Sequence, residues 1–152
     1  MKRQIAKFRI LLGIFFAPWL YIAIWTLPLL EHSAFHKWVV INTFFSYAAF
    51  LSLAGLSHLV LAKIKTEKLW AYCLVMFSIA LTVDLVLSIL ALGGYESNYY
   101  SQTQVVENGS ITFAGYILQL KEALTHGFIS AGVMAIFWVL AIFKSSASIK
   151  NA

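Results

Sequence analysis

The sequence predicts an all-α membrane protein, a four-helix transmembrane bundle with a small extracytoplasmic β-hairpin or amphipathic segment between the third and fourth helices. The first observation is composition, because 61% of the 152 residues are hydrophobic and only 11% are charged, far from the values of soluble domains. The second is that the apolar residues form four long blocks, each long enough or nearly so to cross about 30 Å of hydrocarbon. The third is that the basic residues collect at the ends of these blocks. We therefore expect a single integral membrane domain over residues 1–152.

The four predicted spans cover residues 10–30, 38–62, 69–92 and 127–143. The first follows a basic segment, as a signal peptide would, but its apolar run is too long for cleavage and is interpreted as a retained anchor. Pro18 and Pro28 lie inside this span. Because proline lacks a backbone N–H and clashes with the preceding turn, we expect a kink between Ile14 and Pro18 and an end of the helix near Pro28.

Orientation follows from the basic residues of the short flanks. Nine lie on one side and two on the other, which predicts that both termini face the cytoplasm, most simply at a plasma or inner membrane. The nine are Lys2, Arg3, Lys7, Arg9, Lys63, Lys65, Lys68, Lys144 and Lys150, and the two are Lys37 and Lys121. Since these residues flank apolar blocks instead of forming a basic stripe, no nucleic-acid partner is expected.

The outer loop, residues 93–126, contains two patterns. Asn108-Gly109 stands between residues 99–107 and 110–116, and an Asn-Gly pair between strand-like segments predicts a β-hairpin. The second pattern is an apolar helical face that predicts an amphipathic helix, either lying in the outer interface or extending the fourth span outward. This face consists of Phe113, Tyr116, Ile117, Leu120 and Leu124. The helix and the second strand compete for residues 113–116.

Asp84 is the only acid inside a predicted span, where a charged group costs about 2.5–3.5 kcal/mol. We expect it to face the bundle, and two interpretations remain open. It forms a proton or ligand site, or it is a hydrogen-bonded carboxyl that only fixes helix packing. The predicted intramembrane polar cluster combines Asp84 with residues at similar depth: Ser46, Tyr47 and Ser130, with His126 one turn further out.

The histidines suggest metal or haem chemistry only weakly. His32 and His36 are spaced four residues apart, which makes them candidate ligands of an outer zinc or copper site. A haem between His58 and His126 is not expected, because these residues belong to opposite ends of their spans. The single cysteine, Cys73, has no partner for a disulfide. No cofactor is therefore predicted.

Three functional classes remain. The expected one is a non-catalytic interaction protein, either an accessory subunit of a membrane complex or an immunity-type protein that binds a partner from the outer side. The second is a transporter or channel subunit that uses Asp84, and the third is a membrane enzyme or cofactor-binding subunit. Enzymatic activity is disfavoured because no glycine-rich phosphate loop, nucleophile motif or metal-protease motif occurs. Expected partners are the lipid bilayer and another membrane or extracytoplasmic protein, or a second copy of the chain.

Overall fold

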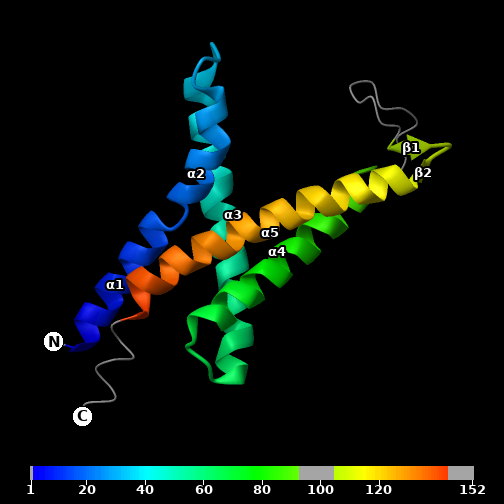
Figure 1. Cartoon of the computed structure of the whole chain (residues 1–152). Helices are drawn as coiled ribbons and strands as arrows, with labels where there is room; N and C mark the ends of the chain where they lie inside the picture. The colour runs from blue at the N-terminus through cyan, green and yellow to red at the C-terminus, as the bar shows by residue number, and fades with distance from the viewer. Residues whose placement is uncertain (1, 93–104, 144–152) are drawn as a thin grey trace.

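The computed structural model describes residues 2–92 and 105–143, which form five α-helices, one 3₁₀-helix and a two-stranded antiparallel sheet (Figure 1). The elements are α1 (Lys2–Phe16), α2 (Trp19–Thr26), η1 (Leu27–Leu29), α3 (Phe35–Ile64), α4 (Leu69–Leu92), β1 (Val106–Glu107), β2 (Ser110–Ile111) and α5 (Phe113–Ala141).

Four helical segments are long and apolar enough to cross a membrane, as the sequence predicts. They cover Phe8–Leu29, Phe35–Leu61, Leu69–Leu92 and Phe113–Ala141. The third agrees with its predicted bounds. The fourth begins well before the predicted residue 127, and this difference moves a predicted site residue, as described below.

The first span is broken at Pro18, which confirms the predicted kink. Helix α1 ends at Phe16 and α2 begins at Trp19, so the last turn of α1 loses backbone partners. The hydroxyl of Tyr47, on α3, donates a hydrogen bond to the carbonyl oxygen of Phe15 at 2.6 Å. A neighbouring helix thus satisfies a backbone group at the break, as apolar surroundings require. The second proline, Pro28, lies in η1, where the first span ends.

We expect the substitution Tyr47→Phe to destabilise the protein, because it removes the donor and leaves the Phe15 carbonyl oxygen unpaired. The cost should be about 1–3 kcal/mol. Each kcal/mol should lower the Tm by about 2–4 °C. The matched control is Tyr116→Phe, since the exposed Tyr116 hydroxyl makes no hydrogen bond with the described residues. Equal melting temperatures of the two variants in detergent would show that Tyr47 does not support the kink.

The helices form two antiparallel pairs that diverge, so the four predicted helices are arranged more openly than a compact bundle. Helix α2 packs on α3 and α4 packs on α5, while α1 packs on α5 and α3 on α4. Figure 1 shows that α2 and α3 run together to one end of the molecule, whereas α4 and α5 run together to another. The kink at Pro18 explains why the two pairs diverge, because it lets α1 pack along α5 while α2 turns away and packs on α3.

The basic ends of the helices are tied together. The Arg9 guanidinium donates to the carbonyl oxygens of Leu140 at 3.0 Å and Val139 at 3.3 Å, where α5 ends. A cation there also complements the helix dipole. The indole N–H of Trp138 donates to the Glu67 carbonyl oxygen at 2.8 Å, so α5 also holds the α3–α4 turn. We call this end of the molecule the basic end.

The predicted hairpin is present but shorter than expected. Val106 pairs with Ile111 and Glu107 with Ser110, and the turn residues Asn108 and Gly109 have φ of 49° and 74°. Positive φ at both positions is what the Asn-Gly pair predicts. The second strand ends at Ile111 because α5 begins at Phe113, so the strand prediction for residues 113–116 is wrong. Residues 99–104 of the predicted first strand lie outside the described residues.

The long α5 corrects the predicted outer loop of residues 93–126. Thr112 caps its start, since the Thr112 side chain accepts a hydrogen bond from the Gly115 N–H at 3.0 Å. The helix buries Gly115, Gln119, Ala123 and Gly127, which are spaced four residues apart and mostly small. Gly127 lies against Phe77 of α4, and Gly115 lies against Val105 beside the hairpin, so small residues allow a close approach at both places. Of the two alternatives for this segment, the outward extension of the fourth span is therefore correct.

Candidate functional site

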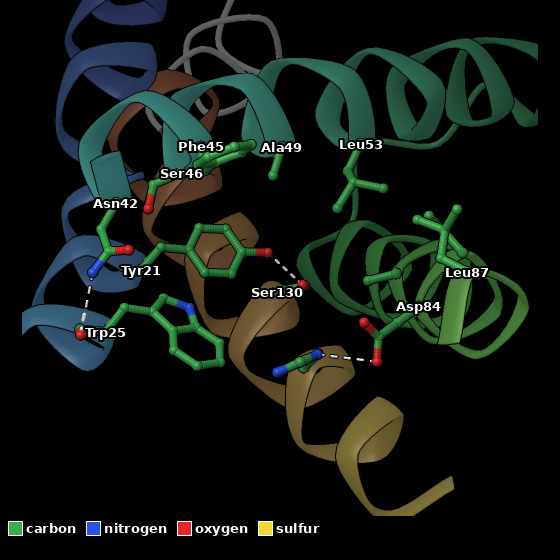
Figure 2. Close-up of a pocket in the computed structure, with 13 residues that line it drawn as sticks. Tyr21, Trp25, Asn42, Phe45, Ser46, Ala49, Leu53, Asp84, Leu87 and Ser130 are labelled. Atoms are coloured by element: carbon green, nitrogen blue, oxygen red, sulfur yellow. Dashed lines mark hydrogen bonds and ion pairs between the residues drawn. The ribbon is translucent and has the colours of Figure 1, made fainter. Parts of the chain in front are cut away.

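A cleft of about 380 Å³ lies between the two diverging helix pairs. Helices α2, α3, α4 and α5 all contribute side chains to its wall (Figure 2). Most of the lining is apolar, and the polar side chains are Tyr21, Asn42, Ser46, Asp84, His126 and Ser130. Volumes of this size, with a few polar groups in an apolar wall, are typical of small-molecule sites.

Asp84 and His126 meet across α4 and α5 at the cleft. The Nδ1 atom of His126 lies 3.0 Å from the Oδ2 atom of Asp84. This is an ion-pair distance, although Oδ2 is buried and receives no hydrogen bond of good geometry from the described residues. The Asp84 side chain keeps 28% of its surface exposed. Its carboxylate is therefore held on one side by the imidazole and open on the other.

The position of His126 differs from the predicted one. The sequence placed it at the outer end of the fourth span, but α5 begins at Phe113, and His126 consequently lies near the middle of the helix. Its ring packs edge-on against Trp25 of α2, with ring centroids 5.2 Å apart. Trp25, His126 and Asp84 thus connect three helices in one row.

The remaining members of the predicted polar cluster separate into two groups. Ser46 and Ser130 are buried and line the same cleft as Asp84. Ser130 is hydrogen-bonded to the hydroxyl of Tyr21. Tyr47 instead bonds the Phe15 carbonyl oxygen and does not line this cleft. Hydrogen bonds from Ser46, Tyr47 or Ser130 to Asp84 are not formed.

Tyr21 is a cleft residue that the sequence reasoning missed. It precedes Trp25 by four residues, so both side chains lie on the same face of α2. In the predicted spans, Trp25 lies at the same depth as Asp84. A polar residue one helical turn before Trp25 faces the same side of the helix, and this spacing is the signal that could have identified Tyr21 as a cleft residue. Asn42 of α3 completes this side of the cleft, because its amide nitrogen donates to the Trp25 carbonyl oxygen at 3.3 Å.

The candidate metal ligands His32 and His36 do not share a helical turn. His32 lies in the turn before α3 begins at Phe35, and its Nδ1 accepts a hydrogen bond from the Ala34 N–H at 3.1 Å. The His36 ring packs on Phe35. Within residues 2–92 and 105–143, no three His, Cys, Asp or Glu side chains gather as a metal site would require. His58 lines a separate cavity near the α3–α4 turn.

The arrangement offers two kinds of chemistry. A carboxylate beside an imidazole can hold a proton between them, and a carboxylate oxygen open to a cleft can accept a hydrogen bond from a ligand. Neither a protein-family model, nor a curated protein, nor a solved structure matches the chain. The function of this protein is therefore inferred from the contacts and exposure of its own residues.

Proposed function

We propose that the protein is a non-catalytic integral membrane protein that crosses a plasma or inner membrane four times and binds a second protein on the outer side. Both termini and the basic end face the cytoplasm. The observation that carries the proposal is a rigid apolar surface at the start of α5, beside the last turn of α4. We call residues 105–117, which include this surface, the outer knob.

The outer knob lies at the outer edge of the hydrocarbon in the proposed orientation. The contacts of His126 with Asp84 and of Gly127 with Phe77 set the antiparallel register of α4 and α5. By this register Leu92, the last residue of α4, lies level with the segment between Thr112 and Leu118. The 24 residues of α4 already cover more than the roughly 30 Å of a hydrocarbon core, at about 1.5 Å per residue. The hairpin, residues 105–111, therefore lies beyond the end of α4, in the interface or the water, and Phe113 and Ile117 lie beside its last turn.

The outer knob is built as a rigid platform. Val105 and Val106 are buried, and the Val105 carbonyl oxygen accepts hydrogen bonds from both the N–H of Thr112, at 2.9 Å, and its hydroxyl. A Cβ atom on Gly115 would come within 2.4 Å of that same oxygen. The sheet thus packs directly on the helix backbone, and only glycine permits this approach.

The exposed side of the outer knob is apolar. Phe113 is 81% exposed, and Tyr116 and Ile117 are each about half exposed. Acyl chains cover such side chains inside a membrane, but the proposed orientation places these three at its outer interface. Aromatic and aliphatic side chains held on a rigid scaffold are typical anchors of protein interfaces. They support a partner that is a protein chain on the outer side.

The cytoplasmic assignment of the basic end is supported by charge. Arg9, Lys63, Lys65 and Lys68 lie at this end among the described residues, and positive flanks favour the cytoplasmic side. The tight contacts of Arg9 and Trp138 close the same end. In this orientation the cleft faces the outer half of the membrane, and the outer knob faces the outer solution.

Site-specific photocrosslinking tests the proposal. A benzophenone amino acid at Phe113 or at Ile117 should give, in native membranes, a discrete adduct with one protein. The matched controls are Phe44 and Leu51, which are 69% and 53% exposed and lie well inside α3, away from either end of that span. These should crosslink to lipid alone. The Phe113 adduct should also weaken when Ile117→Ser removes the neighbouring anchor.

Two outcomes would contradict the proposed partner surface. If Phe113 gives only lipid adducts, as the controls do, the outer knob lies in the membrane interface and binds no protein. An adduct with the mass of two copies of this chain would mean self-association in place of a second protein.

A further inference from the structure

One oxygen of the Asp84 carboxylate faces the cleft without a partner. The Oδ2 atom is buried beside His126, whereas the other oxygen points into the cleft toward Tyr21 and Ser130 (Figure 2). No donor among the described residues reaches this second oxygen, Oδ1. In surroundings of low polarity, an unpaired carboxylate oxygen strongly favours a positively charged partner.

The neighbouring polar groups are largely engaged with one another. The hydroxyls of Tyr21 and Ser130 are hydrogen-bonded together, and the amide nitrogen of Asn42 is bonded to a backbone carbonyl. Asn42 therefore offers its amide oxygen to the cleft. The rings of Trp25 and Phe45 line the same cleft, and aromatic faces attract cations. Oxygen acceptors and aromatic rings together form a wall suited to a cation.

We infer that the cleft binds a primary ammonium group carried on an apolar body. A divalent metal does not fit, because no three ligands of suitable type gather among the described residues. A guanidinium does not fit well either, since its planar fork needs both carboxylate oxygens and Oδ2 is buried. A compact ammonium can donate to Oδ1 alone, while its apolar body lies along the apolar wall.

The amine site is independent of the proposed partner surface. It lies between the two helix pairs, whereas the outer knob lies at the start of α5, where α4 ends. A failure of the photocrosslinking experiment would leave the amine site untouched, and the reverse also holds.

Binding of defined amines tests the inference. The full chain in nanodiscs of zwitterionic lipid is dialysed against decylamine, which enters bilayers, or phenethylamine, which remains largely in water. We expect saturable retention of at least one of them, and the amine retained shows whether the ligand arrives from the bilayer or from water. Asp84→Asn should weaken this binding by at least about tenfold, which is the loss of about 1.4 kcal/mol.

The matched control is Glu31→Gln, which removes the same charge from an exposed acid outside the cleft and should leave binding unchanged. Where Asp84→Asn lowers the helical content, Trp25→Leu decides instead, because it keeps the carboxylate and should still weaken binding several-fold. Retention of neither amine, undiminished binding by the variants, or equal retention of decanoate would overturn the inference.

Discussion

Substituting Gly127→Leu should separate α4 from α5 and give the largest loss of stability of the single changes considered. A Cβ atom on Gly127 would lie 2.9 Å from the Phe77 ring, and a leucine adds three further carbons. The Phe77 ring cannot move away freely, because it packs on Phe128 with ring centroids 5.0 Å apart. Overpacking of this kind costs about 1–3 kcal/mol or more.

The same substitution on α3 provides the control. Gly55 is an exposed helical glycine, and a Cβ atom there would have no atom within 4 Å. Gly55→Leu should therefore be neutral or slightly stabilising, since glycine costs about 0.5–1 kcal/mol in a helix. Thermal unfolding in detergent should show a Tm for Gly127→Leu lower by about 5–10 °C or more. Similar melting temperatures for both variants would contradict the close α4–α5 packing.

Parts of the fold could be predicted because the sequence encodes them locally. Helix α4 agrees with its predicted bounds because Lys68 and Gly93 interrupt the apolar run on either side. The hairpin turn follows from the left-handed backbone that Asn108 and Gly109 readily adopt, and the kink follows from the missing N–H of Pro18. Each of these features depends on a few neighbouring residues.

The start of α5 could not be predicted from hydropathy, because Lys121, Glu122 and His126 interrupt the apolar run. The residues that face α4 carry the missing signal. Ala123 and Gly127 are small residues one helical turn apart, a spacing that indicates close packing against another helix instead of a polar loop. The divergence of the helix pairs depends on contacts between distant segments, such as Gly13 against Phe137, which no local pattern shows.

The candidate site could be predicted only in part, because some of its contacts depend on residues that are distant in the sequence. Asp84 is conspicuous in a hydrophobic span, so its importance could be seen from composition alone. Its contact with His126 depends on the register of α4 and α5, and this register depends on where α5 begins. Tyr47 shares the depth of Asp84, but its hydroxyl bonds a backbone carbonyl that only the kink makes available.

The orientation of the four spans decides which side of the membrane the cleft and the outer knob face, and fusion to a reporter that fluoresces only in the cytoplasm measures it. The account predicts fluorescence after Lys65, in the turn between α3 and α4, and after Ala152. It predicts no fluorescence after Asn108, in the turn of the hairpin. A complementary reporter that is active only outside the cytoplasm should give the opposite pattern. Fluorescence after Asn108 with none after Lys65 would contradict the account, because it would place the outer knob and the cleft on the cytoplasmic side.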